Sequence, residues 1–327
     1  MVFVLSKNKT PLAPTSEAKA RILLKKGKAI VHKVYPFTIR LKENKECKKI
    51  FEIKFDVGAS VTGVAIVDAV KCFFFAEIVH RGAVIKKAMD SRRAIRRSRR
   101  NRKTRYREPR FDNRTRPEGW LPPSVKSRAD NVINFAKKYA KLIPIFSVAV
   151  EKDLSHLKPK KTPKQASIVQ SARTYTIKEL SRNFDVIVGE GWETYANRKE
   201  LGLPKQHYYD AMCIGKEYKY EIVTDKVLEI KAQGRGSRQM CRMDRFGFPR
   251  TKAKSSKIVK GFQTGDIMKA IVSKGKKIGT YLGKVAVRAS GNFNITTTKT
   301  TIQGINYKYC RTIQKGDGYA YAISTIK

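Results

Sequence analysis

Three acidic residues and one histidine stand where apolar segments of the sequence end. Asp56 follows an apolar segment and precedes a glycine turn, and Glu151 follows the apolar run 148–150. Asp210 comes three residues after His207, so a helix would place both side chains on one face. Neighbouring strands lie only about 5 Å apart, so acids at their ends come close together. We therefore expect these side chains to converge.

Clustered carboxylates repel one another, and the repulsion raises their pKa values unless a cation neutralises them. Ligands that offer only oxygen favour magnesium or manganese. Two such ions can activate water and stabilise the leaving oxygen when the water attacks a phosphodiester. We predict two Mg²⁺ ions, replaceable by Mn²⁺, on Asp56, Glu151 and Asp210. His207 would orient or deprotonate the water, or serve the leaving group. All four residues would be catalytic.

Each of these residues also has an ordinary explanation. A lone acid at a strand end is commonly a cap or a surface residue, and a lone histidine commonly lies on the surface or in a core. Glu151 is the hardest to explain in this way, because an acid at the end of a buried strand needs a partner. Composition and spacing alone leave both interpretations open.

The segments that carry these residues have the pattern of a layered α/β domain. Three apolar segments joined by short turns, at 50–56, 61–67 and 72–79, predict an antiparallel meander. Short β segments dominate from about residue 220. The elements predicted between these parts are a helix at 124–142, a strand at 145–151, a helix at 165–180, a strand at 185–189, a loop at 192–204 and a short helix at 205–215.

Changes in composition divide the chain into five parts. Residues 1–49 predict a small α+β domain, with a first strand, a rigid extended link at 11–14 and a helix capped by Thr15 or Ser16. The parts that follow are the first strands of the α/β domain at 50–80, an arginine-rich helix and linker at 81–116, the rest of the α/β domain at 117–219 and a mainly-β domain at 220–327.

The chain is strongly basic. Among its 327 residues, 71 Lys and Arg stand against 27 Asp and Glu, for a formal net charge of +44. Such an excess repels itself in a compact protein, and a polyanion relieves the repulsion by neutralisation and counterion release. The composition therefore favours nucleic acid as a partner. A membrane surface is disfavoured, because the sequence has no apolar run long enough to span and no amphipathic anchor segment.

Residues 81–116 hold sixteen Lys and Arg against three acids. Helical spacing distributes the arginines around the whole cylinder, so no core would hold such a helix. A solvated or disordered charge run is one interpretation. We favour a helix in a nucleic-acid groove, because guanidinium groups bind phosphates bidentately and stack on bases. The predicted nucleic-acid contacts are Arg92, Arg93, Arg96, Arg97, Arg99, Arg100, Arg102 and Arg105, with Arg235 and Arg238 in the C-terminal part.

Other chemistries find no support in the sequence. The five cysteines are odd in number and none has a CxxC spacing, so neither a disulfide framework nor a zinc site is indicated. No GxxxxGK[ST] phosphate loop occurs. The apolar N-terminus is five residues long, too short for a signal peptide. We expect a cytoplasmic protein that associates with the nucleoid when it is bound to DNA.

Several segments resemble the transposon-encoded IscB and IsrB proteins. Residues 56–63, Val150-Glu151 and 194–211 look like the three motifs of their RuvC nuclease domain, and the third is the most specific. Together the matching segments extend over nearly the whole chain. The other similar segments are 2–14 to the PLMP domain, 92–103 to the bridge helix, and 232–239 and 261–266 to the C-terminal region.

Two local departures and one absence separate the chain from this family. The family has Met where Ala13 stands, and Pro-Gly-Ser after the aspartate where 57–60 reads Val-Gly-Ala-Ser. Neither departure removes a catalytic group. IscB carries an HNH nuclease domain between its second and third RuvC motifs, whereas only 152–206 lies between them here. The resemblance is therefore to IsrB, or to an IscB without its HNH domain.

The resemblance implies a RuvC/RNase H-like α/β fold and an RNA-guided DNA endonuclease. A long structured guide RNA, the omega RNA, would pair with one strand of double-stranded DNA, and the protein would read a short adjacent motif. With RuvC alone, we expect a nick in the displaced strand, made by a monomeric protein within a ribonucleoprotein. Two alternatives stay open: a guide-independent nuclease for particular DNA structures, and a non-catalytic RNA-binding protein.

Overall fold

The structure is a computed structural model, and it describes residues 1–101, 115–152, 165–234, 241, 244, 245, 248–252 and 256–326. The chain divides into two compact units. The first unit comprises Met1–Ile30, Arg40–Ala232 and Tyr321–Lys327, and the second comprises Val31–Ile39 and Gln233–Ala320.

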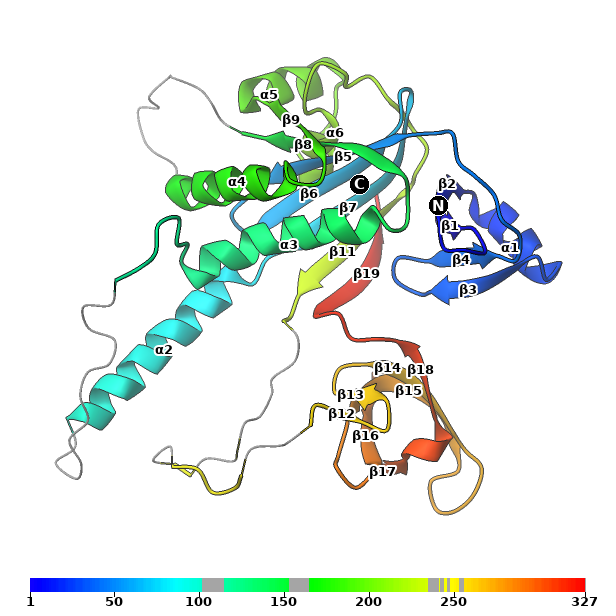
Figure 1. Ribbon diagram of the computed structural model, residues 1–327, viewed down its shortest axis with the longest axis vertical. Coiled ribbons are helices and arrows are strands. Elements are labelled where there is room, and N and C mark those ends of the chain that lie inside the picture. The colour runs from blue at the N-terminus through cyan, green and yellow to red at the C-terminus, as the bar shows by residue number, and fades with distance from the viewer. Residues whose placement is uncertain are drawn as a thin grey trace. The chain divides into compact units, whose positions relative to one another are not determined.

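The first unit is built on a mixed sheet of eight strands, which are β5 (Phe51–Val57), β6 (Val61–Val67), β7 (Lys71–Val79), β8 (Ile145–Glu151), β9 (Asp185–Gly189), β10 (Glu221–Ile222), β11 (Lys226–Ala232) and β19 (Tyr319–Thr325). The order is β19-β11-β7-β6-β5-β8-β9, and β10 pairs with β7 beside this path (Figure 1). β5, β6 and β7 form the antiparallel meander that the sequence predicts. β8 joins β5 in parallel and β9 joins β8 in parallel.

The sheet includes two strands that the sequence assigned to the C-terminal β domain. β11 pairs in parallel with β7, and β19 borders β11 at the edge of the sheet. β11 buries Val227, Leu228 and Ile230. Its side-chain pattern shows that it is a strand, but pairing partners far apart in sequence decide which sheet a strand joins. The boundary expected at residue 220 therefore does not separate two sheets.

Alternation along β5 gives its two faces different neighbours. Phe55 lies edge-on to Phe135 of α3 (Pro123–Tyr139), with ring centroids 5.9 Å apart. α4 (Ala166–Leu180) packs beside α3 near this strand (Figure 1). Asp56 faces α6 (His207–Met212), which packs on β5 and β6. The three helices confirm the predicted helical segments, with ends that differ by a few residues.

A buried lysine fixes the segment that follows α6. Lys54 is 2% exposed, and its ammonium group donates hydrogen bonds to the carbonyl oxygens of Ile214 (2.8 Å) and Glu217 (2.7 Å). Burial lowers the pKa of this ammonium group. A buried charge is tolerated only with such partners, so Lys54 ties the end of α6 to the centre of β5.

The predicted loop at 192–204 is wrong, because most of it is a helix, α5 (Gly191–Glu200). Glu190 and Glu193 form a capping box, in which each side chain accepts from the other's backbone N–H. The common form of this motif begins with Ser or Thr. Because the N-cap residue here is Glu190, the sequence lacks the Ser or Thr that usually marks the start of a helix with a capping box.

The arginine-rich segment forms one long helix, α2 (Gly82–Arg100). Its first residue lies against the guanidinium group of Arg128 on α3. From Lys86 to Arg100 every side chain is exposed, as a helix that is polar on all sides requires. Within the described residues, no helix is long and apolar enough to cross a membrane.

The N-terminal segment forms a four-stranded sheet with a helix. Ser16 caps α1 (Glu17–Lys25), because its hydroxyl accepts from the Lys19 backbone N–H, as the sequence predicts. The extended link expected at 11–14 is part of a strand that pairs antiparallel with the first. The sheet order is β2-β1-β4-β3, with β1 (Val2–Leu5), β2 (Pro11–Thr15), β3 (Ala29–Lys33) and β4 (Thr38–Leu41).

The second unit is mainly β, as predicted. Its five-stranded sheet has the order β17-β16-β15-β14-β18 and packs around Met268, Phe293 and Ile295. Its strands are β12 (Ile258–Val259), β13 (Phe262–Gln263), β14 (Ile267–Val272), β15 (Gly279–Ala286), β16 (Asn292–Thr296), β17 (Thr301–Asn306) and β18 (Cys310–Gln314). The short strands β12 and β13 pair with each other.

The packing of α6 on β6 predicts the effect of a single methyl group. A Cβ added at Gly63 would lie 1.8 Å from the carbonyl oxygen of His207, and backbone cannot yield as a side chain would. We expect Gly63→Ala to displace α6 and lower the free energy of unfolding by about 3 kcal/mol or more. Urea denaturation followed by circular dichroism measures this change.

Gly191→Ala is the matched control. Its Cβ would lie 3.4 Å from Glu151 Oε1, an ordinary van der Waals contact at the start of a helix. This variant should keep the wild-type free energy of unfolding within about 1 kcal/mol. Equal unfolding free energies for the two variants would contradict the close packing of α6 on Gly63.

Candidate active site

A row of acidic residues crosses the sheet at the level of Asp56. Asp56 stands opposite Gly63, Gly63 stands opposite Glu77 on β7, and Glu77 stands beside Glu229 on β11. Residues in register on neighbouring strands direct their side chains to the same face. The three acids therefore share one face of the sheet, and Gly63 leaves room for α6 in the middle of the row.

β8 brings another acid to this face. Val150 is in register with Phe55, so Glu151, the last residue of β8, comes next to Asp56. Burial, and then the negative charge of Asp56, raise the pKa of Glu151. Adjacent parallel strands thus place two carboxyl groups at one corner of the sheet.

α6 adds the remaining two predicted residues to the corner. His207 Nδ1 lies 2.7 Å from Asp56 Oδ2, within a hydrogen bond. Asp210 follows one turn later, and burial and then the charge of Asp56 raise its pKa. The structure places Asp56, Glu151, His207 and Asp210 in one cluster, although they come from two strands and a helix.

Arg173 on α4 lies between two of the acids. Its Nη2 is 2.6 Å from Glu151 Oε1 and 3.8 Å from Asp56 Oδ1. Its Nε donates a hydrogen bond of 3.0 Å to the carbonyl oxygen of Val57. The side chains of the arginine and both acids are largely buried, so their interaction is weakly screened.

A second arginine, Arg198 on α5, pairs with the third acid, Asp210. Its Nε lies 2.6 Å from Asp210 Oδ1, and its Nη1 donates to the carbonyl oxygen of Leu203. Asp56, Glu151 and Asp210 therefore each have a basic neighbour. Neither arginine was singled out in the sequence, because an arginine inside an amphipathic helix has the same pattern whether it faces solvent or a buried acid.

The pKa values of three groups at this corner are raised. Burial first, and then the charge of Asp56, raise the pKa of Glu151 to about 7, although Arg173 acts in the opposite direction. The same two causes raise the pKa of Asp210, against Arg198. The hydrogen bond to Asp56 raises the pKa of His207, although burial opposes it. Each shift follows from crowding of carboxyl groups away from water.

Glu77 is an acid of this cluster that sequence reasoning missed. Burial raises the pKa of its carboxyl group, His207 lowers it, and Glu229 and Asp56 raise it. Pairing the residues of the two predicted hairpins in register, from Asp56 to Gly63 and from Gly63 to Glu77, would have placed Glu77 on the same row. The signal was therefore present in the spacing of the meander, but it depends on the register of both turns.

The donors at the corner fit a hard divalent cation. Asp56, Glu151 and Asp210 offer only oxygen, and a bound cation would offset the burial and the repulsion that raise the pKa values of Glu151 and Asp210. In the present arrangement, no three His, Cys, Asp or Glu side chains of the described residues stand close enough to hold an ion. Arg173 supplies positive charge between Asp56 and Glu151 instead.

The predicted nucleic-acid contacts that lie within the described residues are all on α2, and none belongs to this cluster. The exposed face of α2 carries Arg92, Arg93, Arg96, Arg97, Arg99 and Arg100. Arg102, Arg105, Arg235 and Arg238 lie outside the described residues.

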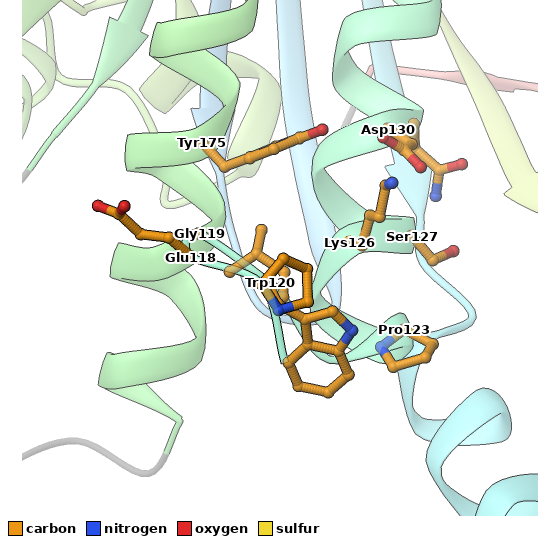
Figure 2. Close-up of a pocket in the computed structure, with 11 residues that line it drawn as sticks. Glu118, Gly119, Trp120, Pro123, Lys126, Ser127, Asp130 and Tyr175 are labelled. Atoms are coloured by element: carbon orange, nitrogen blue, oxygen red, sulfur yellow. The ribbon is translucent and has the colours of Figure 1, made fainter. Parts of the chain in front are cut away.

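A separate pocket of about 540 Å³ lies between α3, α4 and the segment before α3 (Figure 2). Trp120 and Pro123 line one part of it, and Tyr175 of α4 lines another. Burial raises the pKa of Asp130 in its wall. None of the four clustered residues lines this pocket, so it is not part of the candidate site.

Comparison with known proteins finds a family and several similar structures, of which two are described. The family model described as RRXRR protein matches residues 2–168, slightly more than half of the chain. The pattern in that name occurs once on α2, at 96–100, which reads Arg-Arg-Ser-Arg-Arg. No curated protein matches the chain.

Both structures are of RuvC from Thermus thermophilus. The first, in complex with a Holliday junction substrate, shares 14% identity, with a TM-score of 0.29 over 50% of this chain and 89% of that chain. The second shares 13% identity, with a TM-score of 0.28 over 50% of this chain and 90% of that chain.

The raised pKa of Glu151 predicts how stability depends on pH. Between its ordinary value of 4.5 and about 7, the folded protein keeps a proton that the unfolded chain has released. The stabilisation from this group is complete below pH 4.5 and is lost as pH rises through 7, by up to about 3 kcal/mol. Glu151→Gln should remove this part of the slope, measured by urea denaturation with EDTA at several pH values.

The exposed acid Glu118 provides the control for this measurement. Glu118→Gln should retain the wild-type pH dependence, and His207 and Asp210 should leave a residual slope of the same sign in every variant. Identical slopes for the wild type and Glu151→Gln would show that Glu151 does not carry a raised pKa.

Proposed function

The chain belongs to the RRXRR protein family, and we propose that it is a magnesium-dependent DNA endonuclease of the RuvC type, guided by an RNA. One observation carries the nuclease part: Asp56, Glu151 and Asp210 gather with His207 at one corner of a central sheet. An oxygen-only cluster with crowded negative charge is the arrangement that divalent cations bind in phosphodiester hydrolysis.

The carboxylates would bind the metal, and the histidine would serve in proton transfer. Asp56, Glu151 and Asp210 would hold Mg²⁺, which when bound supplies Lewis-acid stabilisation of charge on the phosphate oxygens. His207 keeps Nδ1 on Asp56, which leaves Nε2 for a water molecule or a leaving oxygen. The hydrogen bond to Asp56 raises the pKa of this imidazole, which favours its protonated form.

RNA guidance is supported by charge and by resemblance. The net charge of +44 and the exposed arginines of α2 suit a protein that lies against a large polyanion. The resemblance to IsrB adds an omega RNA that pairs with one DNA strand while the protein reads an adjacent motif. Because IsrB-like proteins have RuvC as their nuclease domain and no HNH domain, the product is a nick in the displaced strand.

Removal of one carboxylate tests the nuclease. Asp56→Ala should slow Mg²⁺-dependent nicking of a guide-matched supercoiled plasmid by about 100-fold or more, because it removes a metal ligand and the partner of His207. Asp185→Ala is the control, since Asp185 is an exposed acid at the start of β9. Gel conversion of supercoiled to open-circular plasmid measures the rate.

Three outcomes would count against parts of the proposal. Unchanged nicking by Asp56→Ala would reject the site. Cleavage of branched DNA by the protein without RNA would favour a guide-independent nuclease. A function that survives the removal of metal and all three carboxylates would make the protein a non-catalytic RNA binder.

The arginine helix predicts a change in the salt dependence of RNA binding. Replacing Arg93, Arg97 and Arg100 by Gln removes three exposed charges from α2. The slope of log K against log salt should flatten by about 0.7 to 0.9 for each RNA phosphate that the variant no longer neutralises. Filter binding of the co-purifying RNA at several salt concentrations measures the slope.

The same charge change on α1 and its C-cap residue serves as the comparison. Lys19, Lys25 and Lys26 are exposed, and their replacement by Gln should flatten the slope less than the α2 variant does. An unchanged slope after the α2 substitutions would show that these arginines do not bind RNA phosphates.

A further inference from the structure

α5 is attached to the candidate site at both ends. At its first residue, Gly191 lies close to Glu151, because a Cβ added to this glycine would be 3.4 Å from Glu151 Oε1. Near its last turn, Arg198 pairs with Asp210 at 2.6 Å. Asn197 donates hydrogen bonds to the carbonyl oxygens of Cys213 (2.9 Å) and Gly215 (3.0 Å), just after α6. The helix is therefore a fixed wall beside the acids.

The outer face of this helix carries two exposed aromatic rings. Trp192 is 63% exposed and Tyr195 is 57% exposed, whereas Thr194 and Arg198 on the inner face are buried. The spacing of three residues puts both rings on the same side of the helix. Trp192 Nε1 donates a hydrogen bond of 2.6 Å to Glu190 Oε2, which orients the indole without covering it.

Positive charge lies next to the rings. The Arg198 guanidinium carbon is 5.6 Å from the centroid of the Tyr195 ring, and the ammonium group of the exposed Lys199 is 5.9 Å from it. The acid at the end of the helix, Glu200, is paired with Lys219 at 2.7 Å. Because Arg198 is buried and paired with Asp210, the exposed Lys199 is the cation available beside these rings. Flat apolar surfaces and a cation are the two elements that bind a strand of nucleic acid through its bases and its phosphates.

We propose that the outer face of α5 is a stacking platform for unpaired bases of the DNA strand that enters the active site. Unpaired bases are required, because a base inside a duplex has both faces covered by its neighbours. The net charge of +44 favours a polyanion over an apolar protein segment. The inference rests on the proposed nuclease function and adds the residues that would hold its single-stranded substrate, Trp192 and Tyr195, on the helix whose other residues contact Glu151 and Asp210.

Base-dependent binding tests the platform without cleavage. The full-length protein is titrated in EDTA, at raised salt, with a fluorescein-labelled single-stranded DNA 12-mer and with an abasic 12-mer of equal charge. Trp192→Ala and Tyr195→Ala should each weaken binding of the normal strand by about 5- to 150-fold, measured by anisotropy. Binding of the abasic strand should stay the same. Phe146→Ala is the control, because Phe146 is 61% exposed elsewhere on the sheet and should have no effect.

Tryptophan fluorescence gives a second readout of the same contact. The chain has two tryptophans, so Trp120→Phe leaves Trp192 as the single reporter. The normal strand should quench its emission and the abasic strand should not. Equal affinity of the wild type for the two strands, or no quenching, would overturn the platform. An effect of the two substitutions on RNA strands but not on DNA strands would also overturn it.

The outcomes separate the platform from the nuclease. Suppose that the wild type nicks DNA and that the Trp192 and Tyr195 variants bind the normal strand as tightly as the wild type. This result would support the nuclease and reject the platform. Base-dependent binding that needs Trp192 and Tyr195, in a protein that never cleaves, rejects the nuclease and supports the platform as a single-strand binding surface.

Discussion

Carboxyl groups crowded at a buried corner repel one another, and much of the first unit is arranged around that repulsion. Arg173 from α4, His207 from α6 and Arg198 from α5 each direct positive charge or a hydrogen bond to one of the acids. Even so, the pKa of Glu151 stays raised to about 7. The corner therefore remains suited to a further cation, and the helices that bring the arginines are also those that enclose it.

Close packing of backbone decides where the corner forms. α6 lies directly on Gly63, in the middle of the acidic row, so His207 meets Asp56 and Asp210 follows one turn behind. Lys54, buried beneath the same helix, holds the carbonyl groups that follow it. A side chain at residue 63 would separate α6 from β6, and the histidine would lose its carboxylate partner.

Charge is divided sharply between the inside and the outside of the protein. The acids of the corner are buried or partly buried, whereas α2 exposes its arginines along nearly its whole length. Basic exteriors attract polyanions at long range, whereas a local cluster of carboxylates offers ligands to hard divalent cations. α5 has both kinds of surface: its outer face exposes aromatic rings, and on its inner face Arg198 pairs with Asp210.

The sequence by itself determined the strands of the meander, the main helices, the basic exterior and the acids near the ends of β5 and β8, because these depend on local periodicity and composition. It missed α5, whose cap begins with glutamate, and it did not show Arg173, Arg198 or Glu77 as neighbours of the clustered acids. Only the tertiary structure decided those contacts, since they require the register of distant strands and the seating of α6 on Gly63. Such partners are set by three-dimensional packing, which no local pattern records.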